Sequence, residues 1–254
     1  MNGYDLLGVR VHALDAQGIL GLIARAVAED RRLVIANHNL HSIYLFHRDE
    51  KMRRLYATAA AIHIDGMPLV AWGRLLGLPL SRRHRVTYHA FVPLLAERAA
   101  AEGWRVFYLG SREDVLARGV ELLRRMAPGL EIATAAGYFD PHGPDNDRVL
   151  RRIQAFRAQV LLVGMGMPRQ EHWILDNLDR LDVNAVLPVG AAIEWVAGEI
   201  PSPPGWMASN GLQWFWRLIR QPRQVWRRYL VEPWALLPLA WRDLLGRWSA
   251  AIPE

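Results

Sequence analysis

Residues 160–173, which read VLLVGMGMPRQEHW, have the residue types and spacing best suited to chemistry in this sequence. An apolar run ends at Gly164-Met165-Gly166, and Pro168 then opens a predicted helix. The first turn of that helix carries Arg169, Gln170 and Glu171. A buried strand that passes through glycine into a helix start leaves unpaired backbone N–H groups aimed at one spot, with the positive end of the helix behind them. This arrangement suits a phosphate group, and the alternative is an ordinary tight turn.

The glycine spacing separates this turn from two common nucleotide-binding patterns. It is not the dinucleotide-binding pattern G-x-G-x-x-G, and no Gly-Lys-Ser/Thr follows as in a P-loop. Gly110-Ser111, which follows a second predicted strand, forms another candidate phosphate cradle.

Polar side chains also follow two strands nearer the N-terminus. Asn37 and Asn39 come after the first of these strands, and Asp65-Gly66 follows the next one. Open α/β sheets bind ligands at the carboxyl ends of their strands, so these side chains are candidates for one site. Each has a structural alternative, because Asn and Asp are also favoured helix caps. Asp65 therefore has two readings, a cap or a general base.

Strands and helices alternate along the chain. Strands are predicted at residues 7–13, 33–36, 60–64, 105–109, 130–135, 160–163 and 183–189. Helices are predicted at residues 16–28, 50–58, 69–76, 91–101, 113–126 and 149–156, with another beginning near Ser42. This alternation predicts an α/β fold, with a Rossmann-like, mostly parallel sheet and helices on both faces.

The amino-acid composition excludes several classes of protein. The chain has 254 residues, of which 52% are hydrophobic, and its formal net charge is +6. No stretch approaches the roughly 18 apolar residues of a membrane-spanning helix, and the first residues do not resemble a signal peptide. No cysteine is present, which excludes disulfides and thiolate metal sites. The nine histidines have irregular spacing and predict no metal site. These features favour a cytoplasmic protein.

Residues 201–254 differ in composition from residues 1–200, so we predict a catalytic domain followed by a C-terminal appendage. From residue 211 onward the tryptophans are Trp214, Trp216, Trp226, Trp234, Trp241 and Trp248. Tryptophan favours the headgroup level of a bilayer, and arginine pairs with anionic lipid or with a diphosphate. The appendage is therefore predicted to lie on a membrane. The alternatives are packing of the tryptophans onto the domain and binding of single-stranded nucleic acid.

Several of these motifs occur in one order that resembles the WecG/TagA/CpsF family of bacterial glycosyltransferases. The resemblance extends from about residue 34 to residue 230. The matching motifs are Asn39, Asp65-Gly66, Arg85-Val86-Thr87, Gly110-Ser111, Gly137-Tyr138-Phe139, Gly164-x-Gly166-x-Pro168-Arg169-Gln170-Glu171, Val189-Gly190-Ala191, and Gly211-Leu212-Gln213-Trp214 with Arg217, Pro222-Arg223 and Arg227-Arg228-Tyr229.

The resemblance implies a glycosyltransferase that moves a sugar from a UDP-sugar, with inversion, to a polyprenyl-diphosphate-linked saccharide at the inner face of the cell membrane. It implies no required metal and no cofactor. We expect no nucleic-acid partner, because the positive charge is concentrated beside an apolar, Pro-broken segment, and a homo-oligomer stays open. Asp65 would be the general base and Asn39 would orient the reactants. The donor would contact Arg85, Gly110, Ser111, Tyr138, Gly164, Gly166, Pro168, Gln170 and Glu171. The acceptor and the diphosphate would contact Asn37, Arg217, Arg223 and Arg227.

This sequence departs from the family pattern at several positions. The family often has Thr at Asn37, Gly-Ser-Asp at Tyr88-His89-Ala90, Lys at Arg169, Asp at Glu194, Arg-Ala-Pro at Ser202-Pro203-Pro204 and Glu at Gln213. The first two departures fall where the sugar or the acceptor should sit, so they leave the sugar open. Our main expectation is glucosyl transfer in exopolysaccharide assembly. The alternatives are N-acetylmannosaminyl or N-acetylmannosaminuronyl transfer in teichoic acid or common antigen synthesis, and a UDP-binding module without catalysis.

Overall fold

A computed structural model describes residues 1–209 and 211–251 of the chain. Its central feature is a six-stranded parallel sheet with the strand order β4-β3-β8-β7-β5-β6. The strands are β3 (Leu33–His38), β4 (Ala61–Ile64), β5 (Arg105–Gly110), β6 (Glu131–Ala135), β7 (Val160–Gly164) and β8 (Ala185–Pro188). Apart from the edge strand β6, their residues are almost all buried, as expected when helices cover both faces of a parallel sheet.

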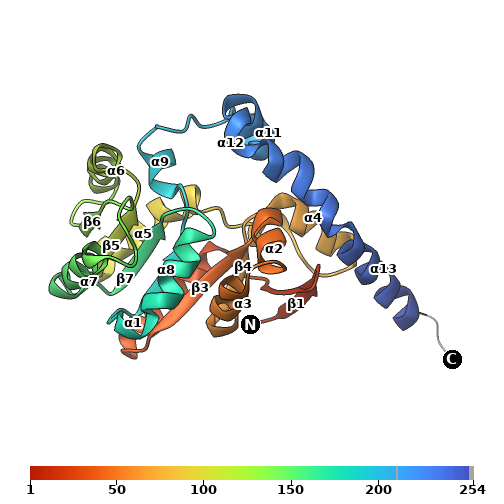
Figure 1. The fold of residues 1–254 in the computed structure, drawn as a ribbon, viewed down its shortest axis with the longest axis horizontal. Coiled ribbons are helices and arrows are strands. Elements are labelled where there is room, and N and C mark those ends of the chain that lie inside the picture. The colour runs from red at the N-terminus through yellow and green to blue at the C-terminus, as the bar shows by residue number, and fades with distance from the viewer. Residues whose placement is uncertain (210, 252–254) are drawn as a thin grey trace.

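Helices cover both faces of the sheet (Figure 1). One hydrophobic cluster joins the sheet to α1 (Ala16–Ala28), α5 (Tyr88–Glu102), α6 (Glu113–Met126) and α9 (Ala192–Val196). A second cluster joins the other face to α3 (Glu50–Thr58), α7 (Pro144–Phe156) and α8 (Arg169–Asn177). Alternate residues of β7 supply the two clusters, because successive side chains of a strand point to opposite faces. The α/β fold predicted from the sequence is confirmed.

The strand predicted at residues 7–13 is confirmed only for Val9–His12. Residues 7–13 are not one strand; β1 (Gly3–Leu6) and β2 (Val9–His12) form an antiparallel hairpin beside the main sheet. The connection consists of Leu7 and Gly8, and both have a positive φ, 51° and 72°. Two-residue hairpin turns favour this backbone conformation because its twist matches that of the strands.

Short helices carry the chain around the carboxyl edge of the sheet. They are α2 (Leu40–Phe46), α4 (Met67–Leu75) and η1 (Arg82–His84). At the opposite edge, η2 (Leu178–Arg180) joins α8 to β8 and contacts Arg32 at the start of β3. We call residues 201–209 and 211–251 the C-terminal segment. It consists of α10 (Gly205–Ser209), α11 (Gln213–Arg220), α12 (Pro222–Trp226), η3 (Arg227–Val231), η4 (Glu232–Leu236) and α13 (Leu237–Ala251). Figure 1 shows α11 and α12 beyond the sheet edge, with α13 extending past the body of the molecule.

The C-terminal segment is fixed to the N-terminal hairpin and to α4 by one carboxylate. Asp243 Oδ2 accepts hydrogen bonds from Leu7 N at 2.7 Å and from Trp72 Nε1 at 3.1 Å. Leu236 is buried against the hairpin and α4, in the same cluster as Leu6 and Leu69. None of the helices in the described part of the chain combines the length and the apolar character needed to cross a bilayer.

Candidate active site

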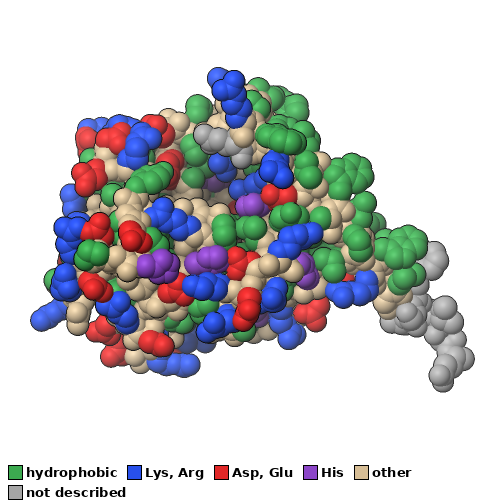
Figure 2. Space-filling view, in the orientation of Figure 1, with side chains coloured by type: hydrophobic (Ala, Val, Ile, Leu, Met, Phe, Trp, Pro, Cys, Tyr) green, Lys and Arg blue, Asp and Glu red, His purple; other side chains and the backbone are tan. Residues whose placement is uncertain are grey.

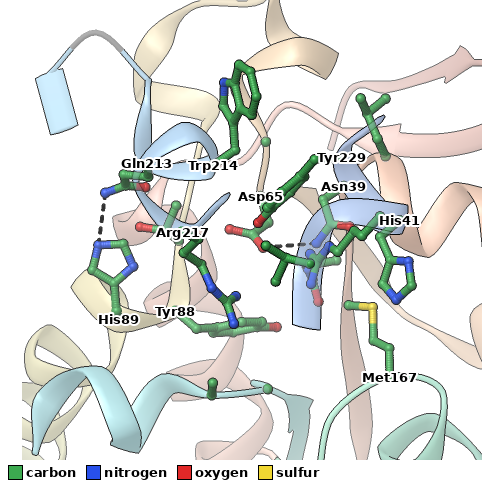
Figure 3. Close-up of a pocket in the computed structure, with 18 of the residues that line it drawn as sticks. Asn39, His41, Asp65, Tyr88, His89, Met167, Gln213, Trp214, Arg217 and Tyr229 are labelled. Carbon is green, nitrogen blue, oxygen red and sulfur yellow. Dashed lines mark hydrogen bonds between the residues drawn. The ribbon is translucent and has the colours of Figure 1, made fainter. Parts of the chain in front are cut away.

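A large pocket lies at the carboxyl edge of the sheet, beneath the C-terminal segment (Figure 3). Its volume is about 820 Å³. Its inner wall comes from the turns that follow β3, β4, β7 and β8, and its outer wall comes from α11, α12, η3 and η4. The pocket therefore requires both the parallel sheet and the C-terminal segment.

Asp65 follows β4 and points into this pocket, where two amides contact it. Asn37 Nδ2 lies 3.4 Å from Asp65 Oδ2, and Asn39 Nδ2 lies 3.3 Å from the same oxygen. Both donors face Oδ2, so Oδ1 remains available to a ligand. Asp65 does not cap α4, whose N-cap is Gly66 and lacks a side-chain hydrogen bond. The structure thus decides against the helix-cap reading of Asp65.

Asn39 performs two functions at once. Its Oδ1 accepts a hydrogen bond from Ser42 N at 3.0 Å, which caps α2, while its Nδ2 faces Asp65. Ser42 Oγ accepts from Asn39 N at 2.8 Å and completes a reciprocal cap. The cap fixes the rotamer of Asn39, so the amide is held in place before any ligand binds.

Burial raises the pKa of Asp65 to about 6, well above the usual value of an aspartate. The hydrogen bond from Asn39 and the positive charges of Arg228, Arg85 and Arg217 act in the opposite direction. At pH 7 the carboxylate is mostly ionised, yet it holds a proton more readily than a solvated aspartate. Such a pKa suits a general base.

Four arginines line the pocket: Arg85, Arg217, Arg227 and Arg228. Arg217 Nε is buried and has no hydrogen-bond partner among the described residues. Burial lowers the pKa of both Arg85 and Arg217, although guanidinium groups remain charged at neutral pH. Concentrated positive charge with unused donors suits an anionic ligand such as a diphosphate.

A chain of hydrogen bonds connects the C-terminal segment to the sheet side of the pocket. Arg85 Nη2 donates to Gln213 Oε1 at 3.1 Å, and Gln213 Nε2 lies 3.2 Å from His89 Nε2 (Figure 3). Burial lowers the pKa of His89 to about 4, so its neutral ring accepts this bond. The His89 ring also packs on Trp195, with the ring centroids 5.1 Å apart. Gln213 thereby fixes one donor of Arg85.

A second connection lies on the other side of Asp65. His41, on α2, has its Nδ1 2.5 Å from Glu232 Oε2 of η4. Both residues line the pocket. The two connections hold the C-terminal segment over the carboxyl edge of the sheet.

The glycine turn after β7 differs from its sequence prediction. We expected its N–H groups to be unpaired, but Gly166 N donates to Gln170 Oε1 at 3.2 Å. Gly190 N, in the turn after β8, donates to the same oxygen at 3.0 Å. The expectation of free amides was therefore wrong for Gly166, because a side chain from the following helix satisfies its N–H.

The structure brings about half of the predicted site residues to the pocket. Those that line it are Asn37, Asn39, Asp65, Arg85, Gly166, Arg217 and Arg227. Those outside its lining are Gly110, Ser111, Tyr138, Gly164, Pro168, Gln170, Glu171 and Arg223. The binding roles of both groups stay predictions.

The residues outside the lining are displaced for different reasons. Gly110 and Gly164 pack backbone to backbone, since a Cβ on Gly110 would lie 2.2 Å from Gly164 O. Gln170 and Glu171 are completely buried beneath the turns, whereas the side chain of Tyr138 is 72% exposed. Ser111 is buried beside Glu194. Pro168 lines a smaller pocket near His172, and Arg223 is exposed.

Sequence reasoning did not select several residues that line the pocket. These are His41, His89, Trp195, Gln213, Arg228, Tyr229 and Glu232. Gln213, Arg228 and Tyr229 lie within the motifs that carry the family resemblance, which was an available signal.

Within residues 1–209 and 211–251, no three His, Cys, Asp or Glu side chains are grouped so that they could hold a metal ion.

Comparisons with known proteins identify the family of this chain. The sequence profile described as Glycosyl transferase WecG/TagA/CpsF family matches residues 4–250. A protein of Bacillus spizizenii named N-acetylglucosaminyldiphosphoundecaprenol N-acetyl-beta-D-mannosaminyltransferase is 29% identical over 73% of this chain and 70% of its own length. A Staphylococcus aureus (strain MW2) protein of the same name is 26% identical over 66% of this chain and 65% of its own length.

The names of these two relatives describe N-acetylmannosaminyl transfer to a diphosphoundecaprenol-linked N-acetylglucosamine. They correspond to one of our alternatives and give no support to glucosyl transfer in exopolysaccharide assembly. The profile match covers nearly the whole chain and includes every pocket residue. The chain belongs to the WecG/TagA/CpsF family of glycosyl transferases.

Proposed function

We propose that this protein transfers N-acetylmannosamine from a UDP-sugar to a polyprenyl-diphosphate-linked N-acetylglucosamine, with inversion at the anomeric carbon. One observation carries the proposal: a half-buried carboxylate, Asp65, faces a pocket lined by four arginines, three of which belong to the C-terminal segment opposite it. A base on one side and fixed positive charge on the other are the two requirements of a single displacement with a diphosphate leaving group. The names of the relatives indicate the sugar and the acceptor.

The mechanism follows from these groups. Asp65 Oδ1 removes the proton of the acceptor hydroxyl as its oxygen attacks the anomeric carbon of the donor. The bond from that carbon to the diphosphate breaks on the opposite face, and UDP leaves with the electron pair. Arg217 and Arg85 stabilise the negative charge that develops on the diphosphate. Asn37 and Asn39 hold Oδ2 and so keep Oδ1 directed at the acceptor.

Binding of the donor should strengthen the base. The positive charges of the arginines around Asp65 lower its pKa. A bound diphosphate offsets their charge, so the pKa of Asp65 rises above about 6 when the donor is present. The carboxylate therefore becomes more basic when its substrates are in place.

The pH dependence of turnover should reveal the ionisation of the Asp65 carboxylate. Because only ionised Asp65 can accept the proton, kcat/KM should fall about tenfold per pH unit below pH 6 and reach a plateau above it. The kcat profile, which reports the substrate complex, should be displaced to higher pH. Initial rates between pH 4.5 and 8.5 test this expectation, and a flat profile between pH 5 and 7 would contradict it.

The sugar assignment calls for a donor panel. Purified protein is incubated with UDP-N-acetylmannosamine, UDP-N-acetylmannosaminuronic acid or UDP-glucose and a short-chain lipid diphosphate that carries N-acetylglucosamine. We expect labelled product from UDP-N-acetylmannosamine at a rate at least about tenfold above the others, a factor that corresponds to roughly 1.4 kcal/mol. Preferred use of UDP-glucose would contradict N-acetylmannosamine as the transferred sugar. UDP binding without turnover of any donor would contradict the proposal that the protein is a transferase.

The C-terminal segment also supports a peripheral location at the cytoplasmic membrane face, where its lipid-linked acceptor would lie. Trp234 and Trp241 are 69% and 64% exposed, and Leu237 between them is 54% exposed. Figure 2 shows hydrophobic side chains gathered over this part of the molecule. Other tryptophans pack instead: Trp216 Nε1 donates to Pro201 O at 2.9 Å. The side chain of Trp248 lies outside the described part of the structure.

Removing exposed tryptophans should weaken membrane binding. The double variant Trp234→Ala/Trp241→Ala should bind vesicles that contain anionic phospholipid at least about tenfold more weakly than the wild type. The reason is that each ring contributes on the order of 1–3 kcal/mol when buried at the interface. Co-sedimentation measures the change. Met126→Ala, which removes an exposed apolar side chain from α6, is the control and should partition as the wild type does. Equal partitioning of all three proteins would reject the membrane role.

A further inference from the structure

Two glycine turns form the floor of the pocket. Gly166 follows β7 and Gly190 follows β8, and both have a positive φ, 80° and 56°. A Cβ at either position would meet no other atom within 4 Å, so this side of each turn is open. The distance between the two turns therefore sets the shape of the floor.

One side-chain oxygen joins the two turns. Gln170 Oε1 accepts from Gly166 N at 3.2 Å and from Gly190 N at 3.0 Å, and Gln170 is completely buried. The carbonyl of Gly190 is held from another direction, because Tyr108 OH donates to Gly190 O at 3.2 Å. Tyr108 OH in turn accepts from Ile193 N at 3.2 Å. The turn after β8 is thus fixed through both of its backbone groups.

Gln170 can join the turns only if its amide has the correct orientation. Rotation by 180° about the terminal bond would present the Nε2 hydrogens to the two N–H groups, and donors would then face donors. Gln170 Nε2 donates to Glu171 Oε1 at 2.8 Å, and this bond selects the observed orientation. Glu171 is completely buried, and its Oε2 has no hydrogen-bond partner among the described residues.

A buried carboxyl with an unsatisfied oxygen is costly for a fold. Burial raises the pKa of Glu171 to about 7, as expected when no cation compensates the charge. Glu171 does not line the pocket and takes no part in the proton transfer described above. Its one described side-chain partner is Gln170, which indicates that its role concerns that amide.

We propose that Glu171 is a positioning residue that orients the Gln170 amide. In that orientation Gln170 holds the turns at Gly166 and Gly190 in the geometry that receives the nucleoside diphosphate part of the donor. This inference rests on the proposed function, since it takes the pocket floor as the donor site. It assigns Gln170 and Glu171 a role beneath the site instead of direct contact with the donor. The Arg85 and Arg217 side chains supply the charge, and the two turns supply the shape.

The test uses two substitutions at position 171 and UDP as the probe. Glu171→Gln keeps a carbonyl that can accept from Gln170 Nε2, so its Kd for UDP should stay within about twofold of the wild type. Glu171→Leu removes the acceptor and lets the amide rotate, so its Kd should rise about tenfold or more. In turnover assays the same change should appear in the KM for the donor, with the KM for the lipid acceptor unchanged. Isothermal titration calorimetry gives the Kd values.

Asn177→Leu is the matched control for loss of a buried polar group. Asn177 is buried at the other end of α8, where it bonds Asn146 and the carbonyl of Trp173, away from the large pocket. This variant should lose thermal stability yet bind UDP as the wild type does. If Glu171→Leu does not fold, Gln170→Met, which removes both acceptor and donor, replaces it with the same expected rise in Kd.

The outcomes separate this inference from the proposed function. No binding of UDP by the wild type would reject the donor site itself. Binding of UDP by the wild type with unchanged Kd in the folded position-171 and position-170 variants would reject the positioning role alone. Equal loss of affinity in Asn177→Leu and Glu171→Leu would also reject it, because general destabilisation would then explain both.

Discussion

Asp65→Asn should lower kcat by about 10²- to 10⁴-fold, the usual contribution of a positioned general base. Asparagine has nearly the same size, and its Oδ1 can still accept from Asn37 and Asn39, so the pocket keeps its shape. The KM for the donor should change little, because the proposed role of Asp65 concerns the acceptor. Transfer of radiolabelled sugar to a short-chain lipid acceptor measures the loss.

Thermal unfolding supplies the control for Asp65→Asn. The folded-state pKa of Asp65, about 6, lies above the usual value of 3.8, so the carboxyl adds to stability below pH 3.8 and this contribution is lost as the pH rises through 6. At pH 7 the asparagine variant should therefore have a Tm no lower than that of the wild type. An active Asp65→Asn enzyme would reject the assigned base, whereas a strongly lowered Tm would attribute the loss to misfolding.

Arg217→Ala should lower kcat/KM by about 10²- to 10³-fold, the typical cost of removing one fixed donor that stabilises developing negative charge. Arg217, on α11 of the C-terminal segment, is placed for this role. It lines the pocket, its charge lowers the pKa of Asp65, and its Nε has no partner among the described residues. Steady-state kinetics with saturating acceptor measures the effect.

Arg223→Ala provides a matched control for charge. Arg223 belongs to the same C-terminal segment, but it is exposed and lies outside the pocket lining. Both variants remove one positive charge and should weaken electrostatic membrane attraction to the same extent. Only Arg217→Ala should lose turnover on a detergent-solubilised acceptor. Equal losses in both variants would contradict a direct role of Arg217.

Arg217 and Arg223 also show where sequence reasoning reaches its limit for the appendage. Both belong to the motifs that resemble the family, and both were predicted to contact the acceptor and the diphosphate because of their place in those motifs. Their positions differ because Arg217 lies on α11, next to the pocket, whereas Arg223 lies in the first turn of α12 after the chain bends at Pro222. A motif orders residues along the chain, and the bend decides which of them faces the site.

The sequence by itself determined the alternation of strands and helices, because periodic burial and glycine or proline breaks are local properties. The helices predicted at residues 16–28, 50–58 and 113–126 coincide with α1, α3 and α6. The local pattern also placed Asn39 and Asp65 at strand ends, and the order of parallel strands then brought them to one edge. The hairpin at Leu7 and Gly8 was missed because the predicted strand at residues 7–13 covers only β2, and the four residues of β1 are too few for a clear strand pattern.

Only the tertiary structure decided how each polar group is used. The N–H of Gly166 was predicted to be free, yet the Gln170 side chain satisfies it together with the N–H of Gly190, which lies 24 positions later in the chain. The partner of Arg85 is Gln213, on a segment that the sequence places 128 positions away. Hydrogen bonds form between groups that are close in space, and sequence spacing carries no information about such long-range neighbours. The chemistry of this site therefore depends on packing between its turns and the C-terminal segment.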